Sequence, residues 1–322
     1  AAAAGLALLL ASSAIYTARL AAERDRARIE AERAERVADF LAGILETEEG
    51  EASAKDLLDA GAARLERELA DQPEVLGRLR EVVGRAYLSL GEDEAALAQF
   101  ERAVEEMGEP AQGADEAAWI DYWNARVRVA LGLNSVGRTE ESIALYREVL
   151  DERIAGLGTH LSVASGHYEL ARALGLAEDA DAALEAYAAS FAVLDALERR
   201  GDDVRDERRI TLLALGDQLT ANGDAAGALE AITEADLVAE ALHGEFHPSR
   251  LEARLAMSWA TRMLGDDDAF EAHLDRAEAL GRELYPEGSF ERIETLKAIA
   301  DSRSGAAQRT RATALYEEVA GQ

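Results

Sequence analysis

The stretch "VGRAYLSLGEDEAALAQFERAV", residues 83–104, decides the fold. It contains no Pro, and Gly84, Gly91, Ala96 and Phe100 stand at intervals among larger apolar residues. This pattern predicts two helices that are separated by a tight turn near Gly91, because Gly tolerates a positive φ. Ala96 would let the two helices approach closely, and Phe100 would fill the space between one pair of helices and the next.

The same pattern recurs along the chain. Small or apolar residues follow Gly91 at offsets of 5, 9 and 12, and five later anchors have comparable residues at these offsets. These anchors, spaced by 41 to 46 residues, are Gly137, Glu178, Gly223, Gly265 and, in a degraded copy, Ala307. A period in this range is typical of a solenoid built from stacked helical hairpins. We therefore assign the repeated Gly, Ala and aromatic residues to packing and not to chemistry.

The composition agrees with a helical protein and excludes several functions. Apolar residues make up 48% of the 322 residues, aromatic residues only 5%, and there are four Pro. The net charge of −30 argues against nucleic acid as a partner and favours basic partners. There is no Cys, so disulfides, thiol nucleophiles and Cys-ligated metals are excluded.

The first residues have a different character. Residues 1–18 carry no charge, and we interpret them as part of a transmembrane helix. A cleaved signal segment and a buried soluble helix are the alternatives. Residues 19–50 alternate in charge and predict a juxtamembrane helix, with a dimerising coiled coil as the alternative. Because the chain starts at Ala1 and not at Met, we expect a fragment or a processed product.

No catalytic or metal-binding constellation is visible in the sequence. His243 and His247 are four residues apart in "HGEFHP", but the order differs from the H-E-x-x-H zinc motif, and Gly244 and Pro248 disfavour a helix there. His160 occupies the matching place of an earlier repeat, so a loop between helices is the preferred interpretation. Acidic runs such as "GDDDAF" are typical of turns and helix starts. We expect no active site, metal or cofactor in this chain.

Residues 83–104 resemble a tetratricopeptide repeat, with that family's Gly, Tyr, Gly, Ala, Phe, Ala pattern. The longer period resembles the kinesin light chain subtype, in which a Gly-x-x-His-Pro element joins successive hairpins. "GEFHPSRLEARLA", residues 244–256, matches this element, and residues 156–171 match it without the Pro. The resemblance implies an all-α fold, a right-handed α-solenoid of about six hairpins over residues 51–322, with the last hairpins degenerate.

A second resemblance concerns the chain's context. The apolar start, the helix "ARLAAERDRARIEAERAERVADFLAGIL" and the segment up to Gly91 resemble the region after the kinase domain of bacterial membrane-anchored serine/threonine protein kinases. The resemblance implies a single-pass protein of the bacterial inner membrane, with residues 1–18 in the membrane and the repeats outside the cytoplasm. ATP and Mg would belong only to an upstream kinase domain, because this chain has no Gly-rich loop, H-R-D or D-F-G motif.

Two functions therefore remain open. The chain is expected to be the non-catalytic sensor or scaffold region of a receptor-like signalling kinase, or a stand-alone membrane-anchored or secreted adaptor. In both, the resemblance implies a protein or peptide ligand in the concave groove formed by the first helix of each hairpin, and self-association is a further option. The predicted groove residues are Arg78, Arg85, Asn124, Asn134, Tyr168, Arg172, Trp259 and Arg262.

Overall fold

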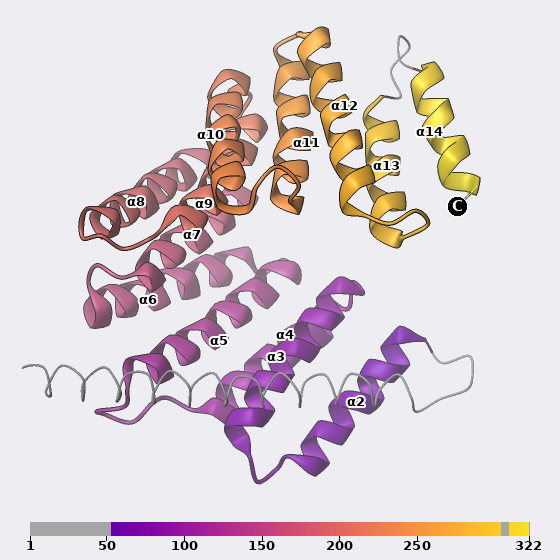
Figure 1. Cartoon of the computed structure of the whole chain (residues 1–322). Coiled ribbons are helices and arrows are strands. Elements are labelled where there is room, and N and C mark those ends of the chain that lie inside the picture. The colour runs from indigo at the N-terminus through magenta and orange to yellow at the C-terminus, as the bar shows by residue number, and fades with distance from the viewer. Residues whose placement is uncertain (1–52, 304–308, 322) are drawn as a thin grey trace, which may run out of the picture. The chain divides into compact units, whose positions relative to one another are not determined.

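The computed structural model describes residues 53–303 and 309–321, and these form thirteen α-helices and no strand (Figure 1). The helices are α2 (Ala54–Glu68), α3 (Pro73–Ser89), α4 (Asp93–Met107), α5 (Glu116–Ser135), α6 (Thr139–Leu157), α7 (Leu161–Leu176), α8 (Ala180–Arg199), α9 (Arg205–Ala221), α10 (Ala225–His243), α11 (Pro248–Met263), α12 (Asp267–Leu284), α13 (Phe290–Ser302) and α14 (Arg309–Gly321). The prediction of an all-helical repeat fold is confirmed.

Some predictions fall outside the described residues. These are the transmembrane helix of residues 1–18, the juxtamembrane helix of residues 19–50, and the anchor Ala307. Within residues 53–303 and 309–321, none of the helices is both long and apolar enough to cross a bilayer.

The described helices belong to two compact units, divided after Arg138. In the first unit, α3 packs against α2 and α4, and α4 packs against α5. In the second unit, α7 and α8, α9 and α10, α11 and α12, and α13 and α14 form hairpins, each packed against the next. The first helices α7, α9 and α11 also contact one another in this order. The prediction that residues 51–322 form one continuous array stays a prediction.

The turns lie where the repeat anchors predict them. Gly91, Gly223 and Gly265 have φ values of 75°, 83° and 75° and connect the two helices of their hairpins. Glu178 stands at the same place between α7 and α8, and with a φ of 60° it is the one described non-Gly residue with positive φ. The amide of the next residue, Asp179, donates to the carbonyl of Leu174 at 3.0 Å and closes the helix end. The hairpin geometry therefore overrides the preference of Glu for negative φ.

We expect Glu178→Gly to stabilise the protein by up to about 1 kcal/mol, because Gly adopts positive φ without the steric cost that a β-carbon brings. Part of this gain is offset by the larger conformational entropy of Gly in the unfolded chain. Urea denaturation of the wild type and the variant measures the difference. The reverse change at an equivalent turn, Gly223→Glu, is the control and should destabilise. A Glu178→Gly variant that is clearly less stable would contradict the strain at this turn.

Within the hairpins, small residues are required by close contact between helices. A β-carbon at Gly84 of α3 would lie 2.5 Å from Cε1 of Phe100 of α4, well inside the contact distance. At Gly216 of α9 it would lie 2.3 Å from Cγ1 of Ile232 of α10. Ala96, like Phe100, is fully buried. The glycines and alanines of the opening stretch thus make room for a large side chain on the partner helix.

Polar side chains begin the helices. Nδ1 of His160 accepts a hydrogen bond from the amide of Ser162 at 3.0 Å and caps α7. His247 caps α11 in the same way through the amide of Ser249, at 3.3 Å. Asp266 caps α12 by accepting from the amide of Ala269, at 2.9 Å. The predicted loop at His243 and His247 is confirmed, because α10 ends at His243 and α11 begins at Pro248.

Buried ion pairs join successive hairpins of the second unit. Asp236 of α10 is 3% exposed and receives two hydrogen bonds from Arg250 of α11, at 2.8 and 3.1 Å. Arg254, one turn further along α11, donates to the same carboxylate at 2.6 Å. Since a buried carboxylate is costly unless it is paired, this cluster fixes how α10 and α11 pack.

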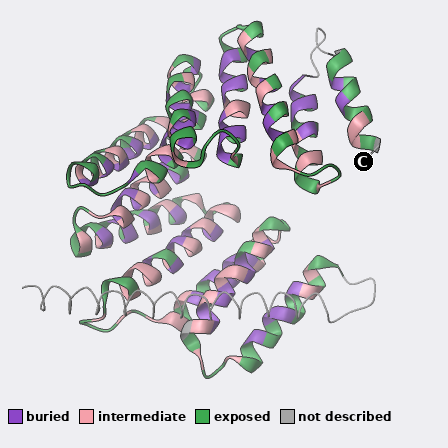
Figure 2. Ribbon diagram, viewed as in Figure 1, coloured by how far each residue is buried: buried purple, intermediate pink, exposed green. Residues whose placement is uncertain are grey.

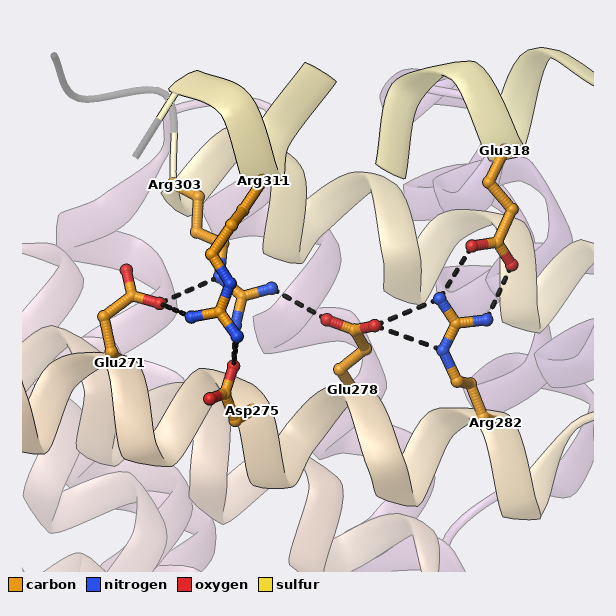
Figure 3. Close-up of polar contacts among 7 residues, drawn as sticks. All are labelled: Glu271, Asp275, Glu278, Arg282, Arg303, Arg311 and Glu318. Atoms are coloured by element: carbon orange, nitrogen blue, oxygen red, sulfur yellow. Dashed lines mark hydrogen bonds and ion pairs between the residues drawn. The ribbon is translucent and has the colours of Figure 1, made fainter. Parts of the chain in front are cut away.

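A second cluster joins α12 to the residues that follow it (Figure 3). The guanidinium of Arg303, at the end of α13 and only 1% exposed, contacts Glu271, Asp275 and Glu278 of α12. Arg311 of α14 reaches two of the same carboxylates, at 2.8 Å for Glu271 and 2.7 Å for Asp275. Glu278 also accepts from Arg282, which pairs with Glu318 of α14 at 2.6 Å. The last hairpin is therefore held by charge as well as by apolar packing.

Candidate functional site

The first helices of the second unit have one accessible side each. On α9, Ile210 and Asp217 are exposed, and on α11, Glu252 and Trp259 are exposed. Both pairs are separated by seven residues, which is about two helical turns, so the members of a pair lie on the same side of their helix. Leu213 of α9 and Met257 of α11 are buried, and Figure 2 colours the described residues by burial.

The spacing from the turns relates the helices to one another. Arg172, Asp217 and Trp259 each lie six residues before their anchor, on α7, α9 and α11. Ile210 and Glu252 each lie thirteen residues before theirs. Because α9 contacts both α7 and α11, these equivalent positions form one surface. We call these five residues the first-helix face.

Trp259 is the most prominent member of this face. Half of its surface, 51%, is exposed to solvent. Met263, one turn further along α11, is 48% exposed, and Ile210 of α9 is 38% exposed. Large exposed apolar side chains that are neighbours on a surface mark places where a partner binds.

Tyr168 and Arg172 lie at the α7 end of the face. The guanidinium carbon of Arg172 is 5.8 Å from the ring centroid of Tyr168, which places the cation over the aromatic ring. Tyr168 in turn meets Tyr187 of α8 edge to face, with centroids 6.5 Å apart. The structure therefore brings these two predicted residues together, and it leaves Arg172 exposed.

The side chain of Arg262 contacts residues of the next two helices. Its Nη1 donates to the carbonyl of Ser302 at 2.8 Å, and its guanidinium lies 5.2 Å from the ring centroid of Phe270. This hydrogen bond satisfies a carbonyl at the end of α13, where no amide of the same helix is available. Arg262 thus connects α11 to α12 and α13.

Four of the predicted groove residues lie on α3 and α5 of the first unit. Arg78 of α3 forms an ion pair with Asp121 of α5, and Arg85 and Asn124 are exposed. Glu81 lies near Arg78 and Arg85, and burial raises the pKa of its carboxyl despite these cations. Asn134 lies in the last turn of α5, where its carbonyl accepts from the amide of Gly137 at 3.0 Å.

Glu252 is a residue of the face that the sequence prediction missed, whereas the family's groove positions, counted from the anchor Gly223, include Asp217. Burial raises the pKa of Asp217, and Arg172 partly opposes this effect. Burial also raises the pKa of Glu252, with a contribution from the charge of Asp217. Both side chains are nevertheless exposed, so they lie on a surface that other helices partly surround. Counting thirteen residues back from each turn, as for Arg78 and Asn124, finds Glu252.

The arrangement offers no site for metal chemistry in the part of the chain that the structure describes. No group of three or more His, Asp or Glu side chains there could hold a metal ion. His243 and His247 stack with ring centroids 4.1 Å apart, and Nε2 of His243 is 3.6 Å from Asp206. These residues belong to the connection between α10 and α11.

The fold is similar to that of solved tetratricopeptide-like repeat proteins, while no protein-family model and no curated protein matches the sequence. The chain therefore has a tetratricopeptide-like helical repeat fold. A structure of kinesin light chain nearly identical TPR-like repeats from Podosopora anserina is 20% identical, with a TM-score of 0.53, over 63% of this chain and 95% of that one.

Two further solved structures have the same fold. BtubC (BKLC) from P. vanneervenii is 18% identical, with a TM-score of 0.56, over 74% of this chain and 96% of that one. A Rap protein complexed with Competence and Sporulation Factor is 13% identical, with a TM-score of 0.56, over 89% of this chain and 87% of that one. At these identities the similarity shows the fold alone.

Proposed function

We propose that this chain is a non-catalytic repeat region that binds a protein or peptide through the first-helix face of its second unit. The observation that carries this proposal is the half-exposed Trp259 on a face shared by three neighbouring first helices. An aromatic residue at such a place provides a large contact area at a low cost in conformational entropy. The Rap protein structure, which holds the Competence and Sporulation Factor, supports the use of this fold for ligand binding.

Selection from a random peptide library on the intact protein tests this function. We expect peptides to be enriched that lose affinity when Trp259→Ala or Arg172→Ala is introduced. Leu237→Ala is the matched control, because Leu237 is 60% exposed on the second helix α10. Enriched peptides that bind the Trp259→Ala and Leu237→Ala variants equally well, or a selection without enrichment, would contradict the proposal.

The context of this binding region is the second part of the proposal. The region is the sensor arm of a receptor-like bacterial serine/threonine kinase, anchored through residues 1–18, with its repeats outside the cytoplasm. Support comes from the resemblance of residues 19–91 to that class of kinase. ATP and Mg would act only in the kinase domain, and ligand binding or self-association of the repeats would change kinase activity.

Peptide mapping of the native gene product upstream of Ala1 tests this context. A Gly-rich loop and an H-R-D-type catalytic loop in the upstream residues are expected. Deletion of residues 55–322 should then abolish signal dependence of the kinase. A mature protein that begins near Ala1, or regulation that is unchanged by the deletion, would favour the membrane-anchored or secreted adaptor instead.

A further inference from the structure

The first-helix face contains two carboxylates that form no ion pair in the part of the chain that the structure describes. Neither Asp217 nor Glu252 forms an ion pair or hydrogen bond with another residue in the described ranges. Two arginines are close enough to influence them, but both have other contacts. Arg209 pairs with Asp206 at 2.8 Å, and Arg172 lies over Tyr168. The two carboxylates therefore repel one another, and a cation between them would remove this repulsion.

Each carboxylate has an apolar neighbour in an equivalent position. Glu252 and Ile210 each lie thirteen residues before the turn of their hairpin, and Asp217 and Trp259 each lie six residues before it. Charge and apolar surface therefore alternate on α9 and α11, which are in contact. Trp259 occupies on α11 the position that Asp217 occupies on α9, and the face of an aromatic ring attracts cations.

From this alternation we infer that the occupant of the first-helix face is an extended peptide segment in which Arg or Lys residues neighbour apolar residues. This inference rests on the proposed function and adds the chemistry of the partner. Arg or Lys side chains of the peptide neutralise Asp217 and Glu252, and its apolar side chains cover Ile210 and Trp259. Charge complementarity selects this occupant over an acidic peptide, which would add like charge to two carboxylates that already repel one another.

The net charge of −30 creates a specific difficulty for the test, because any basic peptide is attracted to this chain. A control must therefore remove the same charge elsewhere on the surface. Glu230 and Glu234 of α10 are both exposed and lie on a second helix, four residues apart. The pair Glu230→Gln and Glu234→Gln matches the change in charge of Asp217→Asn and Glu252→Gln.

The experiment measures the fluorescence anisotropy of labelled synthetic peptides with the intact protein. One peptide is built from Arg, Leu and Ser, a second has Glu in place of Arg, and a third has Gln in place of Arg. We expect the Arg peptide alone to bind. Asp217→Asn with Glu252→Gln should weaken its binding by about tenfold or more, and Trp259→Ala should weaken it as well. The control pair should leave the affinity nearly unchanged, and far-ultraviolet circular dichroism verifies that each variant is folded.

Three results would overturn the inference. Equal loss of affinity in the face variant and in the control pair would show non-specific attraction. Binding of the Glu or Gln peptide in preference to the Arg peptide would show that the partner has different chemistry. No binding of any of the three peptides would also reject a basic occupant. In the last two cases the proposed function would survive if the random library still enriched peptides that depend on Trp259.

Discussion

Replacing Asp236 with Ala is expected to lower the free energy of unfolding by about 3–5 kcal/mol, because the change removes from buried Arg250 the carboxylate that accepts two of its hydrogen bonds. Asp236 and Arg250 are each 3% exposed, and Arg254 donates to the same carboxylate. Glu240 of α10 stays 3.0 Å from Arg250 in this variant, but its side chain is 50% exposed and it does not accept the two hydrogen bonds that Asp236 accepts. Urea denaturation gives the total change, and hydrogen exchange shows whether α10 and α11 open first.

Asp195→Ala provides the matched control. Asp195 of α8 also accepts from an arginine, Arg208, but its side chain is 56% exposed. Exposed ion pairs contribute about 0–1 kcal/mol, so this variant should be close to wild type. Equal losses in the two variants would contradict the importance of burial at Asp236.

Replacing Arg303 with Ala is expected to cost about 3–5 kcal/mol, since the change removes a buried cation from three carboxylates. Glu271 and Glu278 are only 22% and 23% exposed, and the loss of Arg303 would leave like charges close together on α12. The destabilisation should be concentrated in α13 and α14, which pack at the end of the second unit. Amide hydrogen exchange resolved along the chain measures both the size and the position of the effect.

Arg311→Ala distinguishes burial from charge alone. Arg311 contacts Glu271 and Asp275, as Arg303 does, but it is 53% exposed. We expect a change of about 0–1 kcal/mol for this variant. A larger loss for Arg311→Ala than for Arg303→Ala would contradict the interpretation of the cluster in Figure 3.

Local sequence signals predicted much of the fold. The repeat anchors located the turns, including the turn at Glu178, where no Gly is present and the backbone still adopts positive φ. The offsets also placed Ala96 and Phe100 in the core, where both are fully buried. The turns and the contact of Phe100 with Gly84 lie within one hairpin, where the spacing along the chain determines which residues meet.

Contacts between hairpins could not be predicted in the same way. Nothing in the sequence distinguishes buried Arg250 or Arg303 from the exposed arginines of a chain that is rich in Arg and acidic residues. Arg262, a predicted groove residue, also reaches the carbonyl of Ser302, forty residues away, and the sequence did not predict this contact. Which carboxylate an arginine meets depends on how the hairpins stack, and a spacing rule within one repeat does not contain this information.

The candidate face was predicted in part. Tyr168, Arg172 and Trp259 follow from the positions of the family's groove residues, and the structure places them on first helices of the second unit. Glu252 was overlooked because acidic residues occur throughout the chain, which contains 64 Asp and Glu. Glu252 is distinguished by the neighbouring charge of Asp217 and by the lack of an ion pair within the described ranges.

The most direct measurement is to map where a bound peptide lies on the chain. A peptide selected from the random library is given a photo-reactive group, cross-linked to the intact protein, and located by mass spectrometry. Cross-links concentrated on α7, α9 and α11, close to Arg172, Asp217 and Trp259, are predicted. Cross-links concentrated on the second helices α8, α10 and α12 would contradict binding at the first-helix face.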